Sequence, residues 1–351
     1  MTKNKIYDKS TKILYSTDNI QDKYFSVIVT FYGAYCNFCE RCLGSLQKQT
    51  FSNFEIIFVQ DGPSEHEDEL IECFKKSSLN FIYLANSANL GTFESRLRGF
   101  EYSCGEYIYF MDHDDAIADN FLHEMHQASR VKNIDVVECG TITLPHSNRS
   151  TQMETRFKCG EERDGIDIIR RLSLNQSRIE LWNKVFRSQV VKIATSKLRA
   201  TLETANWCYG EDVIMEIEFM SIAKSYIGIG TTNNYYYRHE KAISNSDSIE
   251  KILSMLSCSA RISLYLNKKF TPAYSPELLN NFLWCVKYWL DKSYLSSKQI
   301  DVKSERDSNI KAQIMLISLY YGELIRQNLY STYHANELYN LTVLAKHMHS
   351  Q

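Results

Sequence analysis

The sequence predicts an α/β protein with a doubly wound, mixed but mainly parallel sheet, followed by a C-terminal helical module. In the first half of the 351 residues, short β-branched and aromatic runs alternate with helical patterns over short loops. These apolar runs are continuous, which is typical of strands that are covered on both faces. From about residue 248 the apolar residues recur at helical spacing almost to the end. We therefore expect an N-terminal extension over 1–23, an α/β domain over 24–247 and a helical domain over 248–351.

Four buried strands are expected in the first third of the chain. They span residues 25–31, 54–59, 81–84 and 106–111. The neighbouring helices are expected over residues 37–48, 65–76 and 91–103. Right-handed crossovers bring the carboxyl ends of parallel strands to one edge of a sheet. Asp61, Asn89 and the cluster that begins at Asp112 follow strands and are therefore expected to gather at that edge.

The alternation is looser after about residue 140. Residues 141–163 are polar and irregular, as in a surface connection or a mobile segment near an active site. The later elements are expected to be helices over 164–174 and 211–223, a short strand or turn over 181–186, and strands over 226–229 and 234–238.

The composition is that of an ordinary globular protein, with 44% hydrophobic and 23% charged residues. The formal net charge of −2 gives no reason to expect nucleic acid as a partner. No run is long enough for a membrane-spanning helix, and the polar N-terminus lacks the apolar core of a secretory signal. We therefore expect a cytoplasmic protein with reduced cysteines, and the inner face of the membrane is an alternative location.

Three cysteines recur at every third residue, namely Cys36, Cys39 and Cys42. Thiolates bind zinc and iron–sulfur clusters, but no second ligand pair of matching spacing follows them. The same spacing places all three along one side of a helix. We therefore interpret them as small buried side chains.

The strand expected over 106–111 stops at three closely spaced carboxylates, those of Asp112, Asp114 and Asp115. A hard cation would relieve their repulsion, and oxygen ligands suit Mn²⁺ or Mg²⁺. The alternative is a solvated acidic turn, in which Asp115 or Asp119 caps the following helix.

A second acidic pair, Glu211 and Asp212, follows Gly210 at the start of an expected helix. The helix dipole favours acidic side chains in a first turn, so the pair can be a simple capping feature. A carboxylate in this position can also serve as a general base. From these residues alone the capping interpretation is favoured.

Seven separated motifs resemble glycosyltransferase family 2, the inverting transferases with the A-type nucleotide-diphospho-sugar (GT-A) fold. The bacterial capsule and lipopolysaccharide members are the most similar in style. The motifs are Ser26–Tyr32, Phe58–Ser64, Asn89–Gly91 with Ser95–Gly99, Tyr109–Asp115, Trp182–Arg187, Gly210–Val213, and Tyr235–His239 with Ile243–Ser244. The resemblance covers about residues 24–245. The chain departs from the family at Gln60, where an acid is usual, at Leu97, where Asn is frequent, and at His113, which is unusual inside the acidic motif.

The resemblance implies roles for individual residues. Contacts to the nucleotide sugar are implied for Phe31, Tyr32, Asp61, Asn89, Arg96, Asp112, His113, Arg238 and His239. Asp114, assisted by Asp112, is implied as the ligand of Mn²⁺ or Mg²⁺. Asp212 is implied as the catalytic base, with Glu211 as the second choice. Trp182 and Lys184 are expected to contact the acceptor or a phosphate, although Lys184 can instead be an exposed lysine at a strand end.

The resemblance therefore predicts an enzyme that moves a sugar from a nucleotide-diphosphate donor, a UDP-sugar, to a saccharide or lipid-linked saccharide in surface polysaccharide biosynthesis. Two alternatives stay open: a nucleotidyl or phospho-alditol transferase on the same fold, and a non-catalytic scaffold of an assembly complex. The apolar stripes of the C-terminal helices are expected to form a core. An exposed remainder that docks a second subunit or a membrane surface is the minor alternative.

Overall fold

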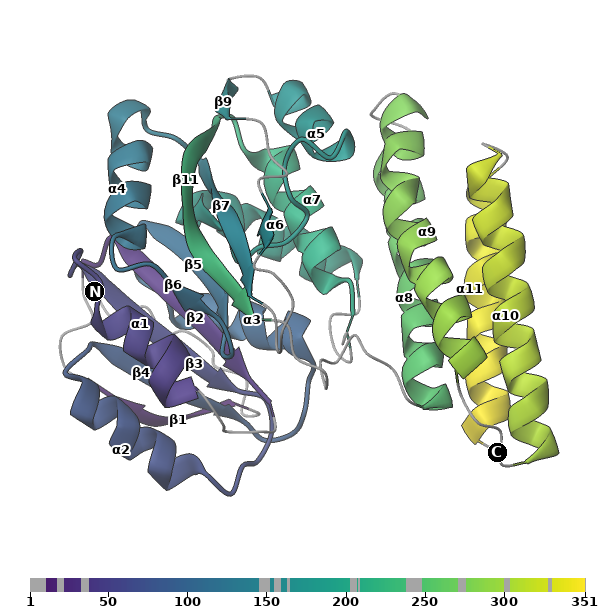
Figure 1. Cartoon of the computed structure of the whole chain (residues 1–351), viewed down its shortest axis with the longest axis horizontal. Helices are drawn as coiled ribbons and strands as arrows, with labels where there is room; N and C mark the ends of the chain where they lie inside the picture. Colours follow the sequence, from purple (N-terminus) through teal and green to yellow (C-terminus); the bar gives the residue numbers. More distant parts are fainter. Residues whose placement is uncertain are drawn as a thin grey trace. The chain divides into compact units, whose positions relative to one another are not determined.

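The computed structural model describes residues 11–17, 22–32, 38–144, 152–154, 159–162, 165–202, 207, 209–237, 248–270, 276–299, 304–327 and 330–350. The chain divides into two compact units (Figure 1). The first comprises residues 1–207 and 215–239, and the second comprises residues 208–214 and 240–351. Residues 208–214, which we expected in the α/β domain, therefore group with the C-terminal helices.

One sheet organises the first unit. Its strands are β1 (Thr11–Ser16), β2 (Phe25–Phe31), β3 (Phe54–Gln60), β4 (Phe81–Asn86), β5 (Tyr107–Asp112), β6 (Ala116–Ile117), β7 (Val136–Leu144), β8 (Gln152–Glu154), β9 (Gly160–Glu162), β10 (Lys184–Arg187) and β11 (Tyr226–Tyr237). Their order is β1-β4-β3-β2-β5-β10-β7-β11-β6, with β8 paired to β7 and β9 to β11. The central strands β4, β3, β2 and β5 are parallel, as are β7 and β11, whereas β10 is antiparallel to both of its neighbours. The predicted mixed, mainly parallel sheet is confirmed.

Side-chain alternation along β2 accounts for its continuous apolar run. Phe25, Val27 and Val29 face a core to which the helices α2 (Glu67–Ser77) and α4 (Phe121–Lys132) contribute. Ile28 points to the opposite face, where its methyl group lies against Gly99 of α3. A strand with helices on both sides has no solvated face, so every residue of β2 is buried.

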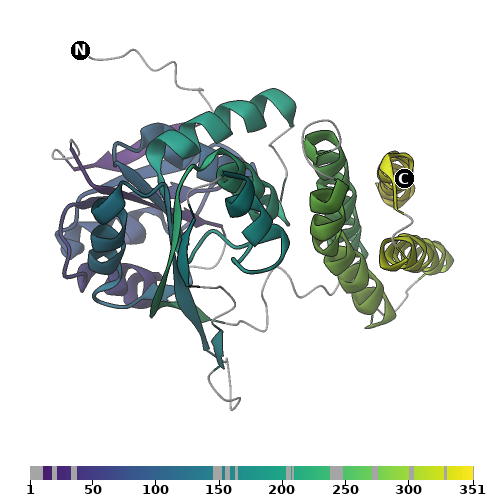
Figure 2. The same ribbon diagram turned by 90° about the horizontal axis from the view of Figure 1, so that it is seen from above.

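The helices of the first unit cover both faces of the sheet (Figure 2). They are α1 (Gly44–Gln47), α2 (Glu67–Ser77), α3 (Thr92–Tyr102), α4 (Phe121–Lys132), α5 (Gly165–Ser173) and α6 (Ser188–Thr201), together with the π-helical turn η1 (Phe38–Leu43) and the part of α7 (Glu211–Ile222) that begins at Met215. On the face opposite to α2 and α4, Phe219 of α7 stacks on Phe110 of β5 with ring centroids 6.0 Å apart. The single helix that we predicted over 37–48 is thus a π-helical turn followed by one short α-helix, and the two predicted strands after residue 225 are one continuous strand.

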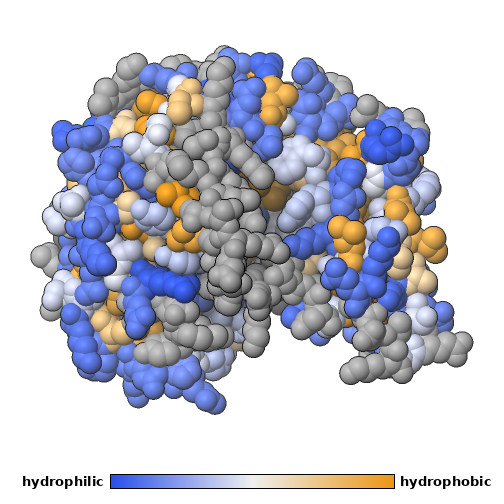
Figure 3. Space-filling model, in the orientation of Figure 1, coloured by the Kyte–Doolittle hydropathy of each residue, from blue (hydrophilic) through white to orange (hydrophobic). Residues whose placement is uncertain are grey.

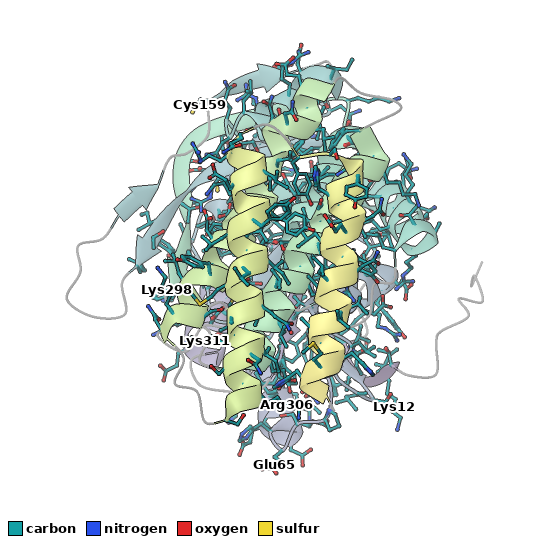
Figure 4. All side chains as sticks on the ribbon, turned by 90° about the vertical axis from the view of Figure 1, so that its right-hand side faces the viewer. Lys12, Glu65, Cys159, Lys298, Arg306 and Lys311 are labelled. Carbon is teal, nitrogen blue, oxygen red and sulfur yellow. The ribbon has the colours of Figure 1, made fainter. Side chains whose placement is uncertain are left out.

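The second unit contains the predicted helical module. Its helices are α8 (Ile249–Phe270), α9 (Pro276–Gln299), α10 (Glu305–Arg326) and α11 (Thr332–Ser350). Figure 4 shows α10 and α11 side by side, with Arg306 between their ends. The guanidinium of Arg306 donates to the last carbonyls of α11, at Met348 and His349. Among the described helices, none combines the length and apolar character needed to cross a membrane.

The drawn surface of both units is mainly hydrophilic, with scattered hydrophobic residues (Figure 3). The helices of the second unit are therefore amphipathic, and their buried stripes form the predicted core. The expectation that the cysteines are reduced was wrong for Cys73 of α2, which is disulfide-bonded.

Two helical glycines should respond oppositely to substitution by alanine. A Cβ at Gly99 would lie 2.5 Å from Ile28 Cγ2, so Gly99→Ala should lower the free energy of unfolding by about 1–3 kcal/mol through overpacking. The nearest atom to a Cβ at Gly322 of α10 would be 3.8 Å away. Gly322→Ala should therefore raise the free energy of unfolding by about 0.5–1 kcal/mol. The added methyl group meets no close neighbour, and alanine leaves the unfolded backbone with less conformational entropy to lose on folding than glycine does. Urea unfolding followed by circular dichroism measures both, and shifts of the same sign would contradict this packing.

Candidate active site

Asp112 is the last residue of β5, and its carboxylate is held from a neighbouring helix. Arg96 of α3 donates from Nη2 to Asp112 Oδ1 over 3.0 Å. The Arg96 side chain is 7% exposed and that of Asp112 is 32% exposed. A buried guanidinium thus fixes a carboxylate that remains partly exposed to solvent. Arg96, for which a contact to the nucleotide sugar was expected, forms an ion pair with Asp112 in the structure.

Asp115 is completely buried beside this group. Its Oδ1 accepts a hydrogen bond of 2.9 Å from the backbone N–H of Tyr237, at the end of β11. Burial, followed by the charges of Asp114 and Asp112, raises the pKa of Asp115 well above its usual value. Asp115 therefore connects the loop between β5 and β6 to the end of β11 and does not cap α4, which begins after Asn120.

Asp61 organises the loop that carries Asn89. Its carboxylate accepts hydrogen bonds from the backbone N–H groups of Leu90 and Gly91, over 2.8 and 2.9 Å, and from Asn86 Nδ2 over 3.1 Å. Asn89 Oδ1 also accepts from the N–H of Gly91, over 3.0 Å. Gly91 has φ +87° and lies against the backbone of Trp207, so a side chain would fit neither its conformation nor its space. Asp61 is thus more than a residue of a simple turn.

The two aromatic residues at the end of β2 differ in exposure. Phe31 is 1% exposed, and its ring meets that of His113 edge-on, with centroids 5.2 Å apart. Phe31 therefore supports the ring of His113 and presents no open face to a ligand. Tyr32 is 58% exposed and offers its ring to solvent.

Trp182 is 7% exposed and lies between two partners. Its ring stacks on that of Tyr236, with centroids 5.3 Å apart and planes inclined by 3°. The guanidinium carbon of Arg178 lies 4.9 Å from the Trp182 ring centroid. Asn234 Nδ2 donates to the Trp182 carbonyl over 2.8 Å, so the residue is fixed to β11 through ring and backbone.

Lys184 is not the ligand-binding or solvent-exposed lysine that we expected, because it is fully buried. Its Nζ donates to the carbonyls of Arg178 and Glu180, each over 2.8 Å, and to Asn183 Oδ1 over 3.0 Å. All three protons of an ammonium are then used within the protein. The lysine thus shapes the segment that carries Trp182.

Two buried carboxylates flank the Lys184 ammonium. Glu138 Oε1 is 3.5 Å and Glu216 Oε1 3.4 Å from Nζ, and all three side chains are 0% exposed. Glu138 also accepts hydrogen bonds from the Tyr226 hydroxyl and the Asn183 amide, whereas neither oxygen of Glu216 has a hydrogen-bond partner among the described residues. Burial raises the pKa of Glu216 to about 8.

Glu211 and Asp212 form the first turn of α7, as predicted. Asp212 Oδ1 accepts a hydrogen bond of 2.8 Å from the N–H of Val213, and Glu211 is 8% exposed. The preceding residue, Gly210, has φ +68°, a conformation that favours glycine. Arg238 and His239, which we expected at the diphosphate, lie outside the described residues.

The acidic residues fit a cation that arrives with its substrate. Within the described part of the chain, no group of three or more His, Cys, Asp and Glu residues is arranged to hold a metal ion by itself. Mg²⁺ and Mn²⁺ commonly use one or two carboxylates and complete their coordination with substrate phosphates and water. Asp114 and Asp112 offer carboxylates of this kind, and both are only half-buried.

The sequence patterns did not single out Arg41, Glu138 or Glu216. The guanidinium carbon of Arg41 lies 4.3 Å from the ring centroid of Tyr237. Glu138 could have been found from the sequence, because it is a lone charge among the mainly apolar residues 136–142. A lone charge in a buried element is expected to pair with an opposite charge, as Glu138 does with Lys184. Glu216 gave no such signal, because Glu218 and the pair Glu211 and Asp212 lie in the same helix.

The raised pKa of Glu216 can be tested through the pH dependence of the melting temperature. A carboxyl group with a raised pKa in the folded state stabilises the fold below its usual pKa of 4.5, and this contribution is lost as the pH rises to about 8. Glu216→Gln should remove this loss, so its melting temperature relative to the wild type should rise between pH 5 and pH 8. Glu72→Gln, at an exposed position, is the control and should show no such trend. Parallel pH profiles for Glu216→Gln and the wild type would contradict a neutral Glu216.

Residues 26–193 match the family model described as Glycosyl transferase family 2. The chain is 27% identical over 191 residues to the glycosyltransferase EpsJ of Bacillus subtilis strain 168, and the alignment covers 54% of this chain and 52% of EpsJ. It is 26% identical over 223 residues to the glycosyltransferase YibD of Escherichia coli K12, and that alignment covers 62% of each chain. The chain thus spans about half to three fifths of the length of these curated relatives.

The fold is similar to that of solved structures of S. aureus TarS. The 1–349 segment of S. aureus TarS superposes with a TM-score of 0.60 at 16% identity, and the match covers 93% of this chain and 92% of that one. The same segment in complex with UDP-GlcNAc gives a TM-score of 0.54, with 88% of this chain and 93% of that one covered. These likenesses confirm the predicted GT-A-like fold. The parallel strands and the acidic end of β5 lie inside residues 26–193, the region over which the chain is similar to glycosyltransferase family 2.

Proposed function

We propose that this chain is a metal-dependent inverting glycosyltransferase that moves a sugar from a UDP-sugar to a saccharide acceptor in surface polysaccharide biosynthesis. The observation that carries the proposal is the acidic end of β5, where Arg96 fixes Asp112 and Asp114 follows two residues later. Carboxylates at the carboxyl end of a central parallel strand lie where open α/β sheets bind their ligands.

Tyr32, the loop held by Asp61 and a structural relative together support a UDP-sugar as the donor. Tyr32 offers an exposed ring for stacking on a base, and Asp61 shapes the loop that presents Asn89. S. aureus TarS, whose fold is similar, was solved with UDP-GlcNAc, which supports a uridine donor. The surface polysaccharide role rests on the motifs that resemble bacterial capsule and lipopolysaccharide enzymes.

The proposed reaction is an in-line displacement at the anomeric carbon of the donor sugar. The carboxylate of Asp212 takes the proton of the acceptor hydroxyl as its oxygen forms the new glycosidic bond. The bond from the anomeric carbon to the diphosphate breaks at the same time, and the configuration inverts. Mn²⁺ or Mg²⁺, held by Asp114 and Asp112, would supply positive charge for the departing diphosphate. Arg96 keeps Asp112 in place for that role.

Replacing the proposed metal ligand should weaken nucleotide binding only when metal is present. Asp114→Asn should reduce the affinity for UDP with Mn²⁺ at least about tenfold, as for the loss of one charge-assisted contact. Calorimetric titration with and without Mn²⁺ measures this. The exposed Asp119 gives a matched control, since Asp119→Asn should leave both affinities unchanged. An unchanged Mn²⁺-dependent affinity in Asp114→Asn would remove the metal assignment.

Replacing the proposed base should affect turnover and not donor binding. Asp212→Asn should lower kcat on the order of a thousandfold, which is typical for the loss of a general base. Its affinity for UDP should stay near that of the wild type. Glu211→Gln, at the adjacent position, should have the smaller effect of the two. A kcat for Asp212→Asn within about threefold of the wild type would exclude Asp212 as the base.

A further inference from the structure

Arg41 is a cation beside the acidic strand end to which the proposed mechanism assigns no role. It belongs to η1, and its guanidinium stacks on Tyr237 with 4.3 Å between the guanidinium carbon and the ring centroid. Stacking fixes the plane of a guanidinium and leaves its N–H edge available. Its Nη1 is buried and has no hydrogen-bond partner in the part of the chain that the structure describes. A buried N–H without an acceptor is costly and therefore rare in folded proteins.

The turn that carries Arg41 packs against the acidic strand end. Its next residue, Cys42, is fully buried, with Sγ 3.8 Å from Met111 Sδ in β5. Burial, followed by the negative charges of the three neighbouring aspartates, raises the pKa of Cys42. Arg41 is therefore adjacent in sequence to a residue that contacts β5 at Met111, one position before Asp112.

Asp115 is a buried acid on which Arg41 acts, because the charge of Arg41 lowers the pKa of Asp115 against the larger effect of burial. It is 0% exposed and is joined to Tyr237 through its Oδ1, but its Oδ2 has no hydrogen-bond partner among the described residues. A buried donor on Arg41 and a buried acceptor on Asp115 thus both lie next to Tyr237, and neither is satisfied by a described residue. The unsatisfied N–H of Arg41 can be met by an acceptor such as a phosphate oxygen, whereas the unsatisfied oxygen of Asp115 needs a donor such as a water molecule.

We propose that Arg41 binds a phosphate oxygen of the nucleoside diphosphate. The inference rests on the proposed function, since it adds a residue to the same donor site. A planar guanidinium suits phosphate oxygens because it can donate two parallel N–H bonds, and a fixed plane reduces the entropy lost on binding. The departing diphosphate would then be neutralised by a side chain of η1 as well as by the cation at Asp114.

The test compares ligands that differ only in the diphosphate. UDP and uridine are titrated with Mn²⁺ into wild type, Arg41→Met and Arg41→Lys, with uridine measured by competition. Arg170→Met is the matched control, because Arg170 is 46% exposed and pairs with Asp167 on the surface of α5. Arg41→Met should bind UDP about ten- to a hundredfold more weakly, as for the loss of a charge-assisted hydrogen bond, while its affinity for uridine stays unchanged. Arg41→Lys keeps the charge but not the planar edge, and should lose about three- to tenfold.

The outcomes separate this inference from the proposed function. A wild type that binds no UDP would overturn the proposed function itself. A wild type that binds UDP, with Arg41→Met within twofold of it, would overturn only the role of Arg41. Equal losses for UDP and uridine would also overturn it, because uridine has no phosphate to contact. If Arg41→Met does not fold, Arg41→Lys decides the question by the same comparison.

Discussion

The concentration of negative charge at the end of β5 is the constraint on which the rest of the first unit depends. Three aspartates within four residues repel one another, and each has different surroundings in the structure. Asp112 receives a guanidinium from α3, and Asp115 is buried against the N–H of Tyr237. Asp114 lies between them in sequence. Elements that are far apart along the chain are thereby joined at one strand end.

A second set of charges lies in the core of the same unit. Lys184 at the start of β10 brings together Glu138 of β7, Glu216 of α7 and the carbonyls of the preceding loop. Breaking a buried charge pair by removal of one partner is costly, so this arrangement specifies the position of the loop that carries Trp182. The lysine that resembled a ligand-binding residue is thus a structural residue of the segment beside it.

The fold was largely predictable because a short, continuous apolar run between turn residues is typical of a strand covered on both faces. The strand–helix alternation identified β2 to β5, and helical spacing identified the C-terminal helices. The site was predictable in part. Motif order located Asp112 and Asp114, but it could not show that Phe31 is covered by His113 or that Lys184 is buried, since both depend on packing between distant segments.

Arg41 was not predictable from patterns along the chain. It lies in an ordinary polar stretch, and only the fold brings it against Tyr237 nearly two hundred residues later. Glu138 was more predictable, because a single charge in an apolar run predicts a buried partner even when the partner is unknown. The grouping of residues 208–214 with the C-terminal helices is likewise a property of packing and not of composition.

The most direct test of the proposed site is a crystal structure of the chain with UDP and Mn²⁺, in which anomalous scattering locates the metal. We predict a manganese peak at Asp114, bridging to the diphosphate, with the carboxylate of Asp212 facing that diphosphate across a gap wide enough for a sugar. A nucleotide bound away from the end of β5, or an Asp212 that shares no cleft with it, would contradict the proposed site.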